Sequence, residues 1–339
     1  MNKTSISWTQ SDDGKAGATW NPTFGCECVS PGCANCYAMR MAGRFSGPGK
    51  PYEGLVTIAK NKRAIWNGTG HLSESALVKP LSWRAPRRVF VNSMSDLFFE
   101  RFTNEEIAAV FGVMAACQQH TFQVLTKRAK RMRGWFEWAA TFHGDPIATC
   151  YFAAKGALTS RDRDAISGRC GMVNKWSAVW PLPNVWIGTS VENQAAADER
   201  IPELLRTPAA IRFLSCEPLI GPVRLHEDGL DWLTSDHCRG VDWVIAGCES
   251  GPGARPCNAS WLRSLRDQCA AAGVAYFLKQ AVNASEGGHR LYPSGRAARS
   301  AVVEVVALGD GSKQKGGGVI ELPYLDGVQH AAFPEVRHV

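Results

Sequence analysis

Seven short apolar segments recur along the chain, and each of them ends abruptly in polar residues. Their apolar runs are rich in Val, Ile, Phe and Trp, which is typical of strands buried on both faces of a parallel sheet. The segments are ATWNPTF (18–24), RVFVNSMSD (88–96), TFQVLTKR (121–128), NVWIGTSVEN (184–193), IRFLSCEP (211–218), DWVIAGCESG (242–251) and VAYFLKQ (274–280).

Segments with helical spacing lie between several of these strands, at residues 103–119, 193–207 and 258–273. Thr103 or Asn104 can cap the first helix, and the last ends on Gly273. Alternating strands and helices indicate right-handed βαβ units. We therefore predict an α/β fold, a partial (β/α)6-type TIM barrel with parallel strands, over residues 1–280.

Two segments do not follow this alternation. Residues 141–180 are predicted to be an insertion, and residues 281–339 a C-terminal extension with a β-hairpin around VVEVVALGDGSKQKGGGVIEL (302–322). In barrels of this class the active site lies at the carboxyl ends of the strands. Polar residues directly after the apolar runs are therefore candidate site residues: Ser93, Ser95, Asp96, Thr126, Lys127, Arg128, Thr189, Ser190, Glu192, Asn193, Ser215, Glu217, Glu249, Ser250, Lys279 and Gln280.

Composition narrows the class of protein. The chain has 339 residues, 45% of them hydrophobic, and a net charge of +7. It contains neither the apolar run of a signal peptide nor a stretch of about 20 apolar residues that could cross a membrane. We expect a soluble cytoplasmic protein without a membrane partner. Basic runs at RAPRR (84–88) and KRAKRMR (127–133) permit an anionic partner without requiring one.

Four cysteines, Cys26, Cys28, Cys33 and Cys36, share the segment FGCECVSPGCANC. Clustered thiols in a chain without an export signal point to metal binding rather than to disulfides. All four could close a structural zinc site. Alternatively, Cys26, Cys33 and Cys36 could hold three irons of a [4Fe-4S] cluster and leave the fourth iron open to another ligand. Their spacing alone leaves both interpretations open.

The segment WNPTFGCECVSPGCANCYAMRMAGRF resembles the cluster loop of a phage and bacterial branch of the radical S-adenosylmethionine (SAM) superfamily, distantly similar to spore photoproduct lyase. FVNSMSDLF, LTKR, WIGTSVENQ, RFLSCEPLIGPV, WVIAGCESGPGARP and FLKQ match the same branch. The resemblance extends from Trp8 to Gln280. It implies that Cys26, Cys33 and Cys36 are the metal ligands and that Cys28 is a bystander.

The resemblance also implies the cofactors and their contacts. A [4Fe-4S] cluster would reduce SAM, and the resulting 5′-deoxyadenosyl radical would remove a hydrogen atom from the substrate. Asp96 is the expected acceptor for the methionine ammonium, with Ser93 and Ser95 on the same loop. Tyr37 would lie near the adenine or pack as an ordinary helix residue. The remaining candidates for SAM binding are Ser190, Glu192 and Asn193, with Glu192 equally able to cap the following helix.

Glu217 and Glu249 each follow a buried strand directly, and a carboxylate in that position must pair or bind something. We predict them as catalytic residues that orient substrate or accept a proton. The alternative is an ion pair with Arg212, Arg255 or Lys279.

The expected substrate is DNA, more specifically a hypermodified thymine base in phage DNA whose 5-substituent is rearranged or isomerised. The base would have to leave the duplex to be reached. Flavodoxin or ferredoxin is the expected electron donor, and the compartment is the host cytoplasm if a phage encodes the chain. One alternative is a radical SAM enzyme acting on a peptide or small metabolite. Another is a zinc-stabilised nucleic-acid-binding protein without catalysis.

Overall fold

The computed structural model describes residues 4, 6–10, 16–159, 162–164, 166–167, 180–227, 230–234, 240–251, 253–281, 284–286, 289–290 and 324–335. All seven predicted strands are present. They are β1 (Ala18–Trp20), β6 (Arg88–Val91), β7 (Thr121–Thr126), β8 (Val185–Ser190), β9 (Ile211–Cys216), β12 (Trp243–Gly247) and β14 (Ala275–Gln280).

The chain divides into two compact units, of which the first comprises Met1–Thr4, Thr9–Thr189 and Arg200–Arg212. Its parallel strands lie in the order β1, β6, β7, β8, with Trp20 beside Val91 and Val91 beside Val124. Because neighbouring strands run in the same direction, their carboxyl ends share one edge. The loops that follow β1, β6 and β7 therefore begin close together.

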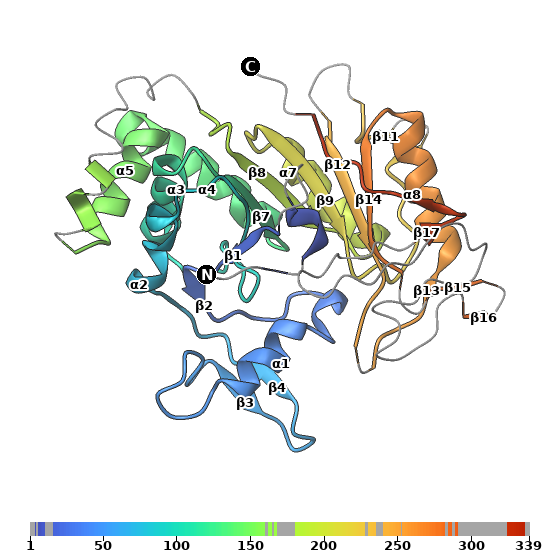
Figure 1. Cartoon of the computed structure of the whole chain (residues 1–339), viewed down its shortest axis with the longest axis horizontal. Coiled ribbons are helices and arrows are strands. Elements are labelled where there is room, and N and C mark those ends of the chain that lie inside the picture. The colour runs from blue at the N-terminus through green and yellow to red at the C-terminus, as the bar shows by residue number, and fades with distance from the viewer. Residues whose placement is uncertain are drawn as a thin grey trace. The chain divides into compact units, whose positions relative to one another are not determined.

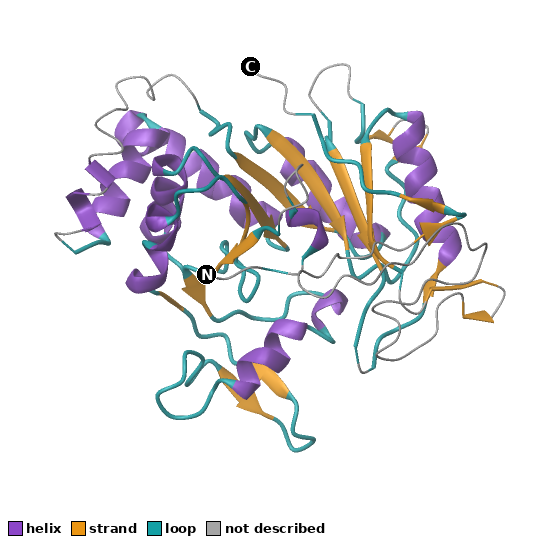
Figure 2. Ribbon diagram, in the orientation of Figure 1, coloured by secondary structure: helices purple, strands orange, loops and turns teal. Residues whose placement is uncertain are grey.

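Three helices group beside these strands in the first unit: α3 (Asn104–Ala116), α4 (Ala129–Thr141) and α5 (Pro146–Gly156) (Figure 2). A capping box between Thr103 and Glu106 begins α3, whose apolar residues are buried all round. Helix α5 lies in the segment predicted as an insertion and packs against α3, where a Cβ on Gly112 would overlap the Cys150 carbonyl.

A small substructure follows the cysteine loop (Figure 1). Helix α1 (Tyr37–Arg44) packs against the antiparallel pair β3 (Val56–Ile58) and β4 (Ala64–Trp66). Tyr52, Leu55 and Trp66 form a hydrophobic cluster with three residues of α1, and Cys26 and Cys36 pack against it. We call residues 37–66 the basic arm. Strand β2 (Thr23–Phe24) pairs with β5 (His71–Leu72), and α2 (Glu74–Leu77) follows.

The second unit comprises Ser5–Trp8, Ser190–Glu199 and Phe213–Val339. Its parallel strands lie in the order β9, β12, β14 and surround a buried aromatic group of Trp8, Phe213, Trp243 and Phe277. Helix α7 (Gln194–Leu205) begins in this unit, and Asn258 caps α8 (Ala259–Ala271). The small strands are β10 (His226–Glu227), β11 (Leu230–Asp231), β13 (Cys257–Asn258), β15 (Ala284–Glu286), β16 (His289–Arg290), β17 (Tyr324–Leu325) and β18 (Val328–Gln329).

The predicted α/β class with parallel strands is confirmed, and it is compatible with a partial TIM barrel. Strict alternation of strand and helix is interrupted in the described residues between β9 and β12, where the hairpin β10–β11 stands in place of a helix. The hairpin predicted at 302–322 lies outside the described residues. No helix in the described ranges is long and apolar enough to span a bilayer.

Candidate functional site

The four cysteines lie in the loop that joins β2 to α1. Gly25 starts this loop with φ +91°, and a Cβ there would overlap the Thr69 carbonyl, so the backbone turn depends on glycine. Cys33 ends a short 3-10 turn that starts at Pro31, and Cys36 immediately precedes α1. All four are free thiols, with Cys28 the most exposed of them. The loop thus brings the predicted ligands into one segment of the first unit.

The thiols differ in their surroundings. The Cys26 sulfur lies 3.9 Å from Arg128 Nη1, and the Cys28 sulfur lies 3.7 Å from Met39 Sδ and beside Cys33. Burial, and then the Asp96 carboxylate, raise the pKa of the Cys26 thiol to about 12. Burial, and then Cys33 and Cys36, raise the pKa of Cys28 to about 11. Both thiols are therefore neutral near pH 7, and metal binding there would release protons.

The donor set fits an iron-sulfur cluster chemically, since soft thiolates are the ligands of such clusters and also of zinc. Within the described ranges, no three His, Cys, Asp or Glu side chains are grouped as a single metal ion would require. Three cysteines of a cluster bind three separate irons, so they need not converge on one point. Measuring the iron, sulfide and zinc content of the protein therefore distinguishes an iron-sulfur cluster from a zinc site.

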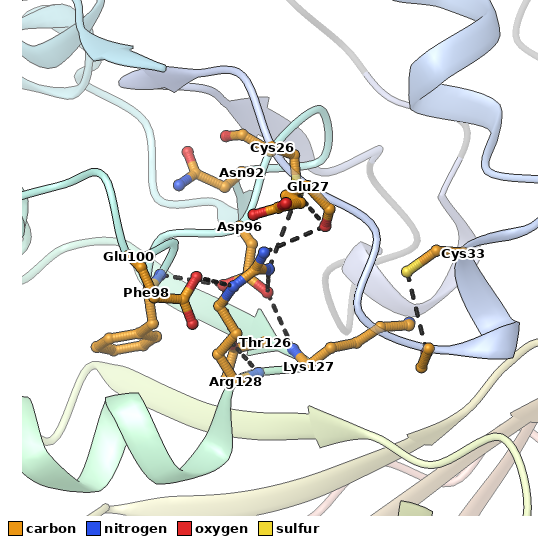
Figure 3. Close-up of polar contacts among 12 residues, drawn as sticks. Cys26, Glu27, Cys33, Asn92, Asp96, Phe98, Glu100, Thr126, Lys127 and Arg128 are labelled. Carbon is orange, nitrogen blue, oxygen red and sulfur yellow. Dashed lines mark hydrogen bonds and ion pairs between the residues drawn. The ribbon is translucent and has the colours of Figure 1, made fainter. Parts of the chain in front are cut away.

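Asp96 lies in the loop after β6 and is 7% exposed. Its Oδ1 accepts hydrogen bonds from Thr126 Oγ1 at 2.7 Å and from the Phe98 amide at 3.0 Å, and its Oδ2 accepts one from the Lys127 amide at 3.0 Å. Figure 3 shows this carboxylate beside the Arg128 guanidinium. Asp96 therefore links the end of β6 to the end of β7. The contact of Asp96 with the methionine ammonium stays a prediction. The ammonium would have to bind a carboxylate that already accepts several hydrogen bonds.

Arg128 connects this carboxylate to the cysteine loop (Figure 3). Its Nε donates to Glu100 Oε2 at 2.7 Å, and its Nη1 pairs with Asp96 Oδ2 at 3.2 Å. Nη2 donates to the carbonyl of Glu27 at 3.1 Å. The sequence pattern identified Arg128 only as one of many polar residues at strand ends. Its direct contact with Cys26, 102 positions away, depends on the tertiary fold.

The loop after β6 also contains Ser93 and Ser95, and Tyr37 contacts it. The Tyr37 hydroxyl donates to the Ser93 carbonyl, while its side chain is 49% exposed and so is not a core residue of α1. Ser95 Oγ donates to the Thr23 carbonyl at 2.8 Å. Asn21 Oδ1 accepts from Ser93 Oγ at 3.2 Å and from the Met94 amide at 3.0 Å. These residues tie the loops after β1 and β6 to each other.

The two predicted catalytic carboxylates lie in the second unit, and both are ion-paired. Lys279 Nζ lies 2.7 Å from both oxygens of Glu217, and Gln280 Nε2 donates to Glu217 Oε1 at 2.7 Å. Glu249 accepts from the amide, Nε and Nη2 of Arg255, the last at 2.6 Å. The alternative ion pairs with Lys279 and Arg255 are thus present. The catalytic roles stay predictions.

The remaining candidates for SAM binding, Ser190, Glu192 and Asn193, also belong to the second unit. Ser190 and Glu192 are both buried, and Glu192 acts electrostatically on Arg255. Asn193 Oδ1 accepts from the Ala196 amide at 3.0 Å, so Asn193 rather than Glu192 provides this bond at the start of α7. The structure therefore forms two groups of site residues. One surrounds the cysteine loop of the first unit, and the other surrounds Glu217 and Glu249 of the second.

Comparison with known proteins places the chain in one family. The model of the family described as "Protein of unknown function (DUF5131)" matches residues 3–334, and the chain belongs to this family. Searches of curated proteins and of solved structures find no match.

Proposed function

We propose that this protein is a radical SAM enzyme in which Cys26, Cys33 and Cys36 hold a [4Fe-4S] cluster. The observation that carries the proposal is the cysteine loop itself. It holds the three thiols of the motif within eleven residues, and Cys26 contacts the buried Arg128, which lies just after the carboxyl end of the parallel strand β7. Strand ends of this kind are where α/β folds of the barrel class build their active sites.

When bound, the cluster would supply the electron for reductive cleavage of SAM, with flavodoxin or ferredoxin as the external donor. The chain's own residues would hold and orient the reactants. Asp96, Ser93, Ser95 and Tyr37 line the loops next to the cysteines and are proposed to bind SAM. Ser190, Glu192 and Asn193 stay proposed SAM-binding residues because of the sequence resemblance alone.

Glu217 and Glu249 are the proposed catalytic residues on the substrate side. In each ion pair a cation lies at hydrogen-bond distance from the carboxylate and compensates its charge. Such a carboxylate can orient a polar substrate group, or accept a proton when its partner shifts.

DNA is the proposed substrate, with a hypermodified thymine as the target base. The basic arm supports this proposal, because it carries six basic residues against one acidic residue, Glu53. All six are exposed: Arg40, Arg44, Lys50, Lys60, Lys62 and Arg63. Exposed Phe45 and Ile65 lie among them. Cations interleaved with apolar side chains suit phosphates and unstacked bases.

The decisive experiment starts from anaerobic purification and reconstitution of the full chain. About four irons and four sulfides per chain, with formation of 5′-deoxyadenosine from SAM and dithionite, support the proposal. One zinc per chain in a colourless protein supports the zinc-stabilised binding protein instead. Incubation with DNA that carries modified thymines, followed by mass spectrometry of the nucleosides, tests the substrate. SAM cleavage with every DNA nucleoside unchanged would favour a peptide or metabolite substrate.

A further inference from the structure

Arg128 is a buried cation in a position that is electrostatically unfavourable by itself. Its side chain is 4% exposed, and it occupies the residue directly before α4, where the helix dipole favours negative charge. Burying a guanidinium at such a place is costly unless partners compensate it. The arrangement of those partners indicates what the residue does.

One side of the guanidinium is fixed by the first unit's framework. Glu100 holds Nε at 2.7 Å, and Asp96, itself bonded to Thr126 and to two backbone amides, holds Nη1 at 3.2 Å. The ring of Phe99 lies beneath it, 4.9 Å from ring centre to Cζ. These contacts leave the planar group little freedom to rotate.

The other side faces the cysteine loop. Nη1 is 3.9 Å from the Cys26 sulfur and Nη2 is 3.1 Å from the Glu27 carbonyl. A guanidinium presents its N–H groups in a rigid fork, so these two contacts define both the position of the sulfur and that of the backbone directly after it. The ion pairs with Asp96 and Glu100 already compensate the charge of Arg128. The contacts with Cys26 and Glu27 are therefore not needed for that purpose.

We infer that Arg128 is a positioning residue for the cluster, which donates to the Cys26 sulfur and raises the reduction potential of the metal centre. This inference rests on the proposed function. Hydrogen bonds to ligand sulfurs and nearby positive charge both stabilise the reduced, more negative state of an iron-sulfur cluster. The contact with Glu27 would hold the loop so that this donor stays aligned.

The test compares reconstituted wild-type protein with Arg128→Gln and Arg128→Lys. Iron and sulfide per chain, the electron paramagnetic resonance spectrum of the reduced cluster, and its midpoint potential are measured. We expect Arg128→Gln to lower the potential and to alter the spectrum, and Arg128→Lys to do so less, because lysine keeps the charge but loses the fork. Arg131→Gln is the matched control, since that arginine bonds to Phe102 and Asn104 instead.

Glu100→Gln is a second variant that uncovers no buried charge, because the Glu100 side chain is 59% exposed. It removes one negative charge beside the guanidinium, and glutamine Oε1 can still accept from Nε, so it is expected to shift the potential slightly upward, opposite to Arg128→Gln. Folding of each variant is followed by circular dichroism. Folded Arg128 variants with wild-type iron content, spectrum and potential would overturn the inference and leave the proposed function intact. A wild-type protein that takes up no cluster would overturn both.

Discussion

Cys28 differs from the other cysteines of its loop at the level of single side chains. It is the most exposed of the four, and its sulfur neighbours are Met39 and Cys33. Cys26 instead contacts Arg128, and both Cys26 and Cys36 pack against the hydrophobic cluster of the basic arm. The resemblance of the cysteine loop implies three ligands and one bystander, and the surroundings of Cys26 and Cys36 differ from those of Cys28.

The cysteines should therefore respond differently to substitution. We expect Cys26→Ala, Cys33→Ala and Cys36→Ala each to lose most of the bound iron and the SAM cleavage activity, because each removes a proposed ligand. Cys28→Ala is expected to keep both. Iron analysis and 5′-deoxyadenosine formation measure the effect. Complete loss of iron in Cys28→Ala would show that the division into three ligands and a bystander is wrong.

Helices α3 and α5 show that a sequence pattern can predict a helix without predicting what the helix packs against. Helix α3 has an N-cap at Thr103 and a long apolar run, and it was predicted. Helices α4 and α5 were not, because KRAKRMR reads as a charged run and α5 lies in a segment without strand alternation. The packing of α5 on α3 includes the close approach at Gly112, which sequence periodicity does not encode.

That close approach predicts opposite effects for two glycine substitutions. Gly112→Ala should lower the free energy of unfolding by about 1–3 kcal/mol, because the new methyl group overlaps the Cys150 carbonyl of α5. Gly134→Ala, in the exposed interior of α4, should raise it by about 0.5–1 kcal/mol, since nothing lies within 4 Å of the added Cβ. Urea denaturation followed by circular dichroism measures both. Equal effects of the two changes would contradict the close packing of α3 and α5.

The distribution of charge over the whole molecule is uneven. The chain carries a net charge of +7, and the basic arm alone has six basic residues and one acidic residue. The composition shows the excess, but only the pairing of β3 with β4 and their packing against α1 gather these cations on one small substructure.

If the arm contacts DNA phosphates, removing its charges should weaken binding in a salt-dependent way. We expect Lys60→Ala/Lys62→Ala to reduce DNA affinity and to flatten the slope of log affinity against log salt by about one per lost contact. Lys79→Ala/Lys130→Ala removes the same charge from exposed positions outside the arm and serves as the control. Fluorescence anisotropy with labelled DNA measures both. An equal effect of the two double variants would show that the arm has no special role.

The sequence by itself determined the seven strands, the helices α3, α7 and α8 and the cysteine motif, because these follow from local periodicity, capping residues and short spacing. It also placed polar residues at strand ends, which is a consequence of parallel topology. Only the tertiary structure decided which of these residues are bonded to each other. Asp96, Arg128 and Cys26 are far apart in the chain, and Glu217 meets Lys279 across 62 positions. Such contacts depend on strand register and side-chain packing, and neither is encoded in a local pattern.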